Sequence, residues 1–475
     1  MAPLDDESPA PLLSIALHVR GISAEKGRAV PVTLLTNADI LTIDAQDNVY
    51  PGGWLAVEDG RIAGIGPAGT VPTGQGDARL NLTGHILLPG LVNAHTHTPM
   101  ILFRGHAEGY SLLTMHGWRT AIRDPELALD ASDIGPATAL SCAEMALSGT
   151  TTFADQYFFA DEVAEATIAS GLRSVLTYGI VELGDAARGR AELQTAIAFV
   201  ERLRDSGGRV TAWLGPHAPY VDNSEELLLA EAAAARRLGI GMHLHMAVGP
   251  EDNEHTLAAR GVTAAVALAQ IGFLDARVLV AHCLDLSPED IAAFAAAPAT
   301  AVAYCATAGL RSGRPCTCPA VALRQAGVIV ALGTDNVASN NSYDMFAEMK
   351  IAGLAASHRE GRAGALPPET LLRMATGEGA RALGLAEQIG SLEVGKRADL
   401  IAVDARGPGY AGAPDLAALL VYSGSGRDVR HVMVDGEWVV RDGALQRQDA
   451  GQLREEFAQV YARFWARVRS RQAES

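Results

Sequence analysis

The stretch HILLPGLVNAHTH, residues 85–97, starts as an apolar run and ends in two histidines one residue apart. Side chains two positions apart on an extended strand point to the same side, so His95 and His97 can reach one point in space. A chain with 13 histidines is expected to contain about 0.4 such pairs by chance. The pair therefore suggests a metal chelate on a strand, and the rest of the chain decides between a metal site and a chance pair.

Seven more strand-like runs follow this stretch, and Ala- and Leu-rich helical stretches separate them. Short apolar runs that alternate with helical segments are typical of parallel sheets in α/β proteins. Eight strands alternating with helices predict a (β/α)8 barrel of the TIM type. The seven further runs cover residues 149–155, 172–179, 209–217, 240–246, 277–283, 300–305 and 327–335.

Two β-rich segments flank the predicted barrel, and each contains an Asp-Gly pair typical of a tight hairpin. Asp59-Gly60 lies in the first segment and Asp435-Gly436 in the second. We expect the two segments to pair into one small β-sandwich domain. The predicted organisation is an N-terminal extension (residues 1–30), the small β-domain (31–88 and 388–447), the barrel (89–387) and a C-terminal helix (448–475).

Polar residues are concentrated where the predicted strands end. In a barrel of this type the C-terminal ends of the strands converge on one face, and catalysis takes place there. A packed core gains nothing from polar groups at these positions, so their clustering predicts a site. The residues at the strand ends are His95, His97, Asp155, Tyr178, His217, His243, His245, His282 and Asp335.

These side chains suit one divalent metal ion. Neutral imidazoles with one carboxylate bind zinc, which we expect first, and also iron, manganese or cobalt. A catalytic site keeps one position open for a water molecule, which the metal activates. Asp335 is a candidate to bind the metal and to accept the water proton, and His282 to orient that water or to polarise a carbonyl. Of His243 and His245, we expect only one to be a ligand.

The overall composition argues against several classes of partner. The formal net charge is −17, which disfavours nucleic acid and anionic membranes. No apolar window is long enough for a membrane span, and the acidic N-terminus lacks the features of a secretory signal. The five cysteines are an odd number and predict no disulfide framework. We expect a cytoplasmic protein that acts on a small molecule.

Longer motifs resemble the amidohydrolase superfamily, in its cytosine deaminase and triazine hydrolase branch. LPGLVNAHTHTPMILFRG (88–105) resembles the first metal motif of that branch, and GPHAPY (215–220) resembles the motif of S-adenosylhomocysteine and methylthioadenosine deaminases. LGTDNVASNNSYDMFAEMKIA (332–352) resembles the eighth strand with its aspartate. The resemblance implies a homo-oligomer, with His282 near the water and His217 facing the substrate. It implies one metal ion held by His95, His97, His245 and Asp335.

Three positions depart from the deaminase pattern. Deaminases of this family carry His-x-x-Glu at the fifth strand, where the glutamate transfers a proton, but Val248 stands there in HLHMAVGPEDNE (243–254). Gly117 stands where nucleoside deaminases place an acidic residue before a tryptophan, and Tyr304 replaces the histidine of the seventh-strand motif. Because valine cannot transfer a proton, deamination needs another group, and His243 or Tyr304 are candidates.

The lost polar groups favour a less polar substrate. Our leading hypothesis is a metal-dependent hydrolase that cleaves an amide, urea or carbamate-type C–N bond in a small, fairly apolar molecule such as an N-substituted or aryl urea. Phenylurea hydrolase and molinate hydrolase belong to the branch that the chain resembles. The alternative is an aminohydrolase, a deaminase of an aminated heterocycle such as a purine, pterin or triazine. The expected substrate contacts are His217, Trp118, Met115, Tyr157, Tyr304 and Asn336.

Overall fold

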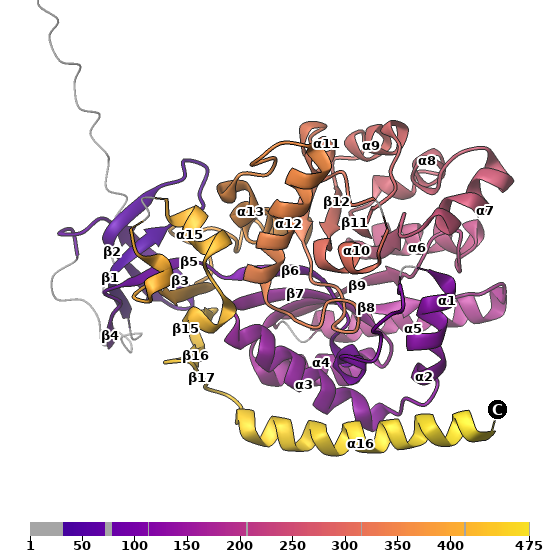
Figure 1. Cartoon of the computed structure of the whole chain (residues 1–475), viewed down its shortest axis with the longest axis horizontal. Coiled ribbons are helices and arrows are strands. Elements are labelled where there is room, and N and C mark those ends of the chain that lie inside the picture. The colour runs from indigo at the N-terminus through magenta and orange to yellow at the C-terminus, as the bar shows by residue number, and fades with distance from the viewer. Residues whose placement is uncertain are drawn as a thin grey trace, which may run out of the picture.

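The computed structural model describes residues 32–71, 78–112, 114–205, 208–314, 316–412 and 415–474. A barrel surrounded by helices forms one part of the molecule, and a sheet with strands from both ends of the chain lies beside it (Figure 1). The predicted N-terminal extension, residues 1–30, lies outside the described residues.

Eight parallel strands form the barrel, and they are neighbours in the order in which they occur along the chain. The barrel closes where the last strand meets the first, because the backbone N–H after β13, at Asp335, donates to the carbonyl oxygen of His95 over 2.9 Å. The predicted α/β fold, a (β/α)8 barrel of the TIM type, is confirmed. The strands are β6 (Leu91–Thr96), β7 (Thr150–Tyr157), β8 (Arg173–Ile180), β9 (Val210–Pro216), β10 (Met242–Met246), β11 (Val278–His282), β12 (Thr300–Tyr304) and β13 (Ile329–Leu332).

Mostly small side chains fill the inside of the barrel, among them Ala154, Ala281 and Ala303. Their strand neighbours Val280 and Val302 pack in a separate layer between the strands and the helices. Because successive side chains of a strand point to opposite faces, each apolar run contributes to two cores, one inside the barrel and one between the strands and the helices. The surrounding helices are α3 (Ala131–Leu147), α4 (Ala160–Ser170), α5 (Ala186–Asp205), α6 (Glu225–Leu238), α7 (Pro250–Arg260), α8 (Ala264–Gln270), α9 (Pro288–Ala295), α10 (Ala306–Arg311), α11 (Ala320–Gln325), α12 (Met345–Glu360), α13 (Pro368–Met374) and α14 (Gly377–Ala382).

The second sheet has nine strands, and β5 joins its two halves. β5 pairs in parallel with β1 and antiparallel with β14, so the N-terminal and C-terminal segments share one sheet. Both predicted hairpins form, because Asp59-Gly60 and Asp435-Gly436 have the positive φ angles that a two-residue turn requires. The strands are β1 (Thr33–Leu41), β2 (Val49–Glu58), β3 (Arg61–Gly66), β4 (Ala78–Asn81), β5 (His85–Pro89), β14 (Leu400–Asp404), β15 (Val429–Val434), β16 (Glu437–Arg441) and β17 (Ala444–Leu445).

The stretch of residues 85–97 divides between the two sheets. Its first part is β5 and its second part is β6, and Gly90 lies between them. A Cβ atom at Gly90 would lie 2.1 Å from the hydroxyl oxygen of Thr151 in β7, so only glycine allows the backbone at residue 90 to pass this close to β7. The two histidines thus extend from a strand whose start is tied directly to the small sheet.

Buried ion pairs connect the small sheet to the N-terminal end of the barrel. Arg173, the first residue of β8, lies with its Nε 2.8 Å from Asp399 Oδ2 and its Nη2 2.7 Å from Asp435 Oδ1. Arg209, next to the start of β9, lies with its Nε 2.8 Å from Asp435 Oδ2. We refer to Arg173, Arg209, Asp399 and Asp435 as the junction network.

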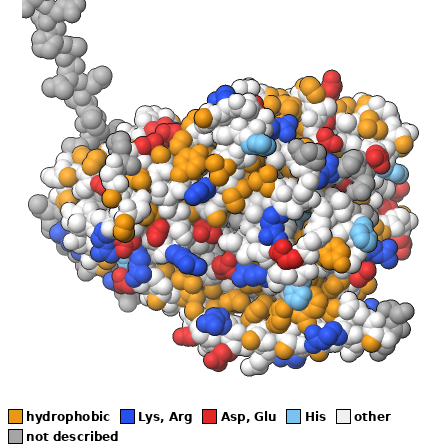
Figure 2. Space-filling view, in the orientation of Figure 1, with side chains coloured by type: hydrophobic (Ala, Val, Ile, Leu, Met, Phe, Trp, Pro, Cys, Tyr) orange, Lys and Arg blue, Asp and Glu red, His pale blue; other side chains and the backbone are white. Residues whose placement is uncertain are grey.

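The chain ends in a long helix, α16 (Ala450–Glu474), which runs along α3 (Figure 1). Leu453, Val460, Phe464 and Val468 are buried on its inner face. Hydrophobic side chains line the seam between this helix and the body of the molecule (Figure 2). Among the described residues, none of the helices combines the length and the apolar composition needed to cross a membrane.

Candidate active site

The histidines and the aspartate named from the sequence meet at the C-terminal end of the barrel. His95 lies at the end of β6, His245 in β10 and His282 at the end of β11, while His97 and Asp335 follow β6 and β13. Two groups place a ligand atom of each member within 4.8 Å of the others. These groups are His95, His245 and His282, and His95, His97 and Asp335.

The protonation of two rings follows from their hydrogen bonds. His97 Nδ1 lies 2.5 Å from the carbonyl oxygen of Gln156, and His245 Nδ1 lies 3.0 Å from that of His217. Because a carbonyl oxygen only accepts, both rings carry a proton on Nδ1 and present a lone pair on Nε2. The two Nε2 atoms are 3.2 Å apart. Two lone pairs at this distance repel each other unless a cation lies between them, so this geometry fits a metal ion.

His95 supports the same reading. Its Nε2 is buried without a hydrogen-bond partner among the described residues, and it lies 3.4 Å from Asp335 Oδ1. His95 Nδ1 is 2.7 Å from His243 Nε2. His243 therefore contacts His95 from behind, whereas His245 places its Nε2 in the cluster. This difference favours His245 as the ligand. Burial, followed by neighbouring histidines, lowers the pKa of both His95 and His245 well below the usual value, as neutral ligands require.

Asp335 is held by its own loop. Ser339 donates its hydroxyl to Oδ2 over 2.7 Å, and the Asn336 amide donates to Oδ1 over 2.9 Å. Burial acts to raise the pKa of Asp335, but His282, His97 and the Ser339 hydrogen bond lower it below the usual value. His282 and Asp335 have φ angles of 76° and 60°. Such left-handed conformations of non-glycine residues occur preferentially at functional sites.

His217 lies beside the cluster with its own carboxylate partner. Its ring centre is 5.0 Å from that of His245 and 6.3 Å from that of Trp118. Its Nδ1 lies 2.5 Å from Asp222 Oδ2. Burial acts to lower the pKa of His217, but Asp222 raises it above the usual value. The structure thus brings His217 and Trp118 to the mouth of the site.

Three other expected substrate contacts have different surroundings from those expected. Tyr157 donates its hydroxyl to Glu126 Oε1 over 2.7 Å. Tyr304 is fully buried in the layer between β12 and the helices, in the same register as Val302, and is not brought to the cluster. Asn336 uses its amide group on Asp335 and on the backbone of Ser339. The side chain of Met115 lies outside those that the structure describes.

Val248 occupies the position at which deaminases of the family carry a glutamate. The Val248 side chain is half-buried against the core, its N–H donates to Asp252 Oδ2 over 2.7 Å, and its carbonyl accepts from Arg314. Sequence reasoning missed Asp222 and Glu126, which partner His217 and Tyr157. No spacing rule indicates either acid, because each lies in a loop or short helical turn, and only its proximity to a named residue would have suggested it.

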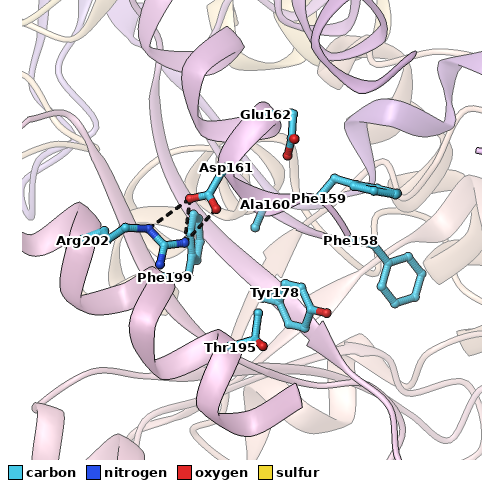
Figure 3. A pocket seen from close by; sticks show the side chains of 9 residues that line it. All are labelled: Phe158, Phe159, Ala160, Asp161, Glu162, Tyr178, Thr195, Phe199 and Arg202. Atoms are coloured by element: carbon cyan, nitrogen blue, oxygen red, sulfur yellow. Dashed lines mark hydrogen bonds and ion pairs between the residues drawn. The ribbon is translucent and has the colours of Figure 1, made fainter. Parts of the chain in front are cut away.

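A cavity of about 460 Å³ opens beside the cluster. Its wall includes Ser339, which contacts Asp335, and the ion pair of Glu108 and Arg311, 2.7 Å apart. A second cavity of about 300 Å³ lies between α4 and α5, where Asp161 pairs with Arg202 (Figure 3). This second cavity includes Tyr178, which the sequence placed at a strand end. It includes none of His95, His97, His245, His282 and Asp335, which we call the metal cluster because they could hold a metal ion.

The barrel and its cluster of histidines and an aspartate define a metal-dependent hydrolase. Residues 86–439 match the family model described as the Amidohydrolase family. The chain is 40% identical over 429 residues to a 5-methylthioadenosine/S-adenosylhomocysteine deaminase of Moorella thermoacetica, which covers 90% of this chain and 97% of that one. The chain therefore belongs to the amidohydrolase family and is an enzyme that hydrolyses C–N bonds.

Solved structures agree with this assignment. An adenosine deaminase of Xanthomonas campestris with bound zinc superimposes with a TM-score of 0.85 at 30% identity, covering 91% of this chain and 98% of that one. A triazine hydrolase of Arthrobacter aurescens superimposes with a TM-score of 0.82 at 24% identity, covering 91% and 99%, which shows the fold alone. The predicted superfamily and the single divalent metal, with zinc first, are confirmed, whereas the branch is matched in part. The homo-oligomer stays a prediction.

Proposed function

We propose that this enzyme is an aminohydrolase that replaces the exocyclic amine of a 6-aminopurine, carried by an adenosine derivative, with oxygen. The deaminase relatives support this reading, which was the alternative from the sequence, over urea hydrolysis. The observation that carries it is His217, whose ring centre lies 5.0 Å from that of His245 and whose Nδ1 is held by Asp222, so that a proton donor lies beside the cluster. The facing lone pairs on His97 and His245 fit a cation in the same site. A small-molecule substrate also agrees with the cavity beside Asp335.

We propose that His95, His97, His245 and Asp335 hold the metal ion. A divalent ion such as zinc, when bound, lowers the pKa of its water to about 7 and so supplies the nucleophile. Ser339 and Asn336 fix the Asp335 carboxylate, so its orientation is set before the substrate arrives. Asp335 accepts the proton of the attacking water, and His282 orients that water.

Deamination also needs a proton on the ring nitrogen and one on the leaving amine. Val248 cannot supply either, and the Tyr304 side chain lies on the outer face of β12. We therefore assign the ring proton to His217, whose hydrogen bond to Asp222 orients the ring beside His245. Water adds to the ring carbon, and one of its protons passes through Asp335 to the amine. The other proton leaves the new hydroxyl as the carbonyl forms and ammonia departs, and it restores, directly or through solvent, the proton that His217 gave to the ring nitrogen.

The direct test is mass spectrometry of products from zinc-loaded enzyme. The panel would contain adenosine, 5-methylthioadenosine, S-adenosylhomocysteine, a pterin and an aminotriazine, together with aryl ureas and anilides. Replacement of an amine by oxygen in a purine, with release of ammonia, is the expected result. Release of an aniline or an alkylamine from a urea or amide, without any deamination, would overturn the proposal.

One observation favours a second candidate, the hydrolysis of an amide or urea bond in an apolar molecule. That reaction needs no proton on a ring nitrogen, and the half-buried Val248 suits an apolar group. The variant Val248→Glu separates the two candidates. If the enzyme is a deaminase, the restored acid should raise kcat/KM for ammonia release by about tenfold or more. No gain, with loss of urea hydrolysis, would support the second candidate.

A further inference from the structure

A short segment between β6 and α3 along the chain carries Trp118 to the side of the cluster. It consists of α1 (Met115–Trp118), a π-helical turn (Arg119–Arg123) and α2 (Asp124–Glu126), and we call it the mouth segment. Its Trp118 lies next to His217, with ring centres 6.3 Å apart. π-helical turns are rare and are frequently found at functional sites. Because Trp118 belongs to this segment, the contacts that fix the segment also fix where Trp118 lies beside His217.

Glu126 is the anchor at the far end of the segment. Only 8% of the residue is exposed, yet it is an acid. Tyr157 donates its hydroxyl to Oε1 over 2.7 Å, and Arg123 Nη1 lies 3.1 Å from Oε2. A buried carboxylate is costly unless it is paired, so these contacts fix where Glu126 lies. The Arg123 guanidinium also lies 5.5 Å from the ring centre of Phe158, which borders the cavity of Figure 3.

Three consecutive residues at the end of β7 join this anchor to the metal cluster. The Gln156 carbonyl accepts from His97, and its side-chain amide donates to the His243 carbonyl over 2.8 Å. The next residues are Tyr157 and Phe158, which contact Glu126 and Arg123. The same strand end therefore supports a ring of the metal cluster on one side and the mouth segment on the other.

We propose that Glu126 is a positioning residue whose hydrogen bond with Tyr157 holds Trp118 in place over the substrate beside His217. The proposal rests on the proposed function in one respect, because the flat ring that Trp118 covers is the purine. Tyr157 accordingly acts through Glu126 and does not itself contact the substrate.

The kinetic test uses Glu126→Gln and Tyr157→Phe with a matched control on the same segment. Asp124 is an exposed acid that lies 3.5 Å from Arg119, so Asp124→Asn removes a similar charge without touching the anchor. A hydrogen bond to a charged group contributes enough to change KM by about tenfold. We expect KM for the purine to rise by that factor in both anchor variants, with kcat and zinc content nearly unchanged, and no change in Asp124→Asn. Tyr157→Phe removes this bond, whereas Glu126→Gln weakens it, because the neutral amide oxygen can still accept from the Tyr157 hydroxyl. The two losses should therefore be less than additive in the double variant.

A second measurement does not depend on turnover. The chain has five tryptophans, so 5-fluorotryptophan labelling should produce five ¹⁹F signals, and Trp118→Phe identifies the one of interest. We expect that signal to shift or broaden in Glu126→Gln and Tyr157→Phe but not in Asp124→Asn. An unchanged Trp118 signal together with an unchanged KM would overturn the proposal, as would a loss of zinc in place of the KM effect. If the signal moves as expected but no purine is deaminated, the positioning role stands and the proposed function fails.

Discussion

Both ends of the barrel bury polar side chains, but they satisfy them differently. At the N-terminal end, the junction network pairs Arg173 with Asp399 and Asp435 at 2.7–2.8 Å, and opposite charges compensate each other. At the C-terminal end, His95 Nε2 and His282 Nδ1 are buried without partners among the described residues. A fully paired network stabilises the junction, whereas unpaired donors and acceptors remain available for a metal and a substrate. Hydroxyls without partners, such as that of Thr150, occur at the N-terminal end as well. It is therefore the pairing of the charged and metal-ligating groups that distinguishes the structural end from the functional one.

The largest effect is expected at the functional end, from Asp335→Asn. The neutral amide is a weaker metal ligand than the carboxylate and cannot accept the water proton, so activity should fall by about a thousandfold or more. Metal analysis of the purified variant should show reduced zinc per chain, while its thermal unfolding in the absence of metal changes little. Full metal content with full activity would refute the assigned role of Asp335.

At the structural end we expect Asp399→Asn to lower the free energy of unfolding and to leave zinc binding unchanged. Removal of this charge leaves the buried Arg173 with one fewer partner, and breaking a buried pair costs about 3–5 kcal/mol. Urea unfolding should show this loss of stability, while the folded variant keeps its zinc. If Asp399→Asn instead lost zinc without losing stability, the distinction between the two ends would be wrong.

A pH-dependent effect is expected from Glu348 in α12. This acid accepts from neutral donors, the hydroxyl and N–H of Thr307 and the amide of Asn340 at 2.6–3.1 Å, and the backbone N–H of Ala306 acts on it as well. Burial raises the pKa of Glu348 from 4.5 to about 7. Because the folded pKa is the higher one, its stabilising contribution is complete below about pH 4.5 and is lost as the pH rises through 7.

The matched variant is Glu348→Gln, which does not titrate. Between pH 5 and pH 8, the wild-type chain should lose up to about 3 kcal/mol of unfolding free energy relative to this variant. Chemical denaturation at both pH values measures the difference. A difference that stays constant with pH would show that Glu348 is ionised throughout.

The smallest effect is expected from Asp161→Asn. Asp161 pairs with Arg202 at 2.7 Å in the cavity of Figure 3, but both side chains are more than half exposed. Exposed pairs contribute at most about 1 kcal/mol, so unfolding free energy and activity should hardly change. Asp161→Asn breaks the same kind of aspartate–arginine pair as Asp399→Asn, but at an exposed position, and so serves as its control. A loss as large as that of Asp399→Asn would mean that pairing alone, without burial, sets stability here.

The sequence by itself determined the barrel, the two hairpins and the gathering of polar groups at one end of the strands. These features depend on local periodicity, on Asp-Gly turns and on the position of polar residues after apolar runs, all of which are visible along the chain. Only the tertiary structure decided how individual side chains are used. Tyr304 lies in a strand that is apolar on both faces, so no alternation in the sequence indicates which face it joins. Tyr157 is hydrogen-bonded to Glu126, and the contact of His243 with His95 gives His243 a different role from His245. These pairs join residues far apart in the chain, so they are set by the way the strands and loops pack.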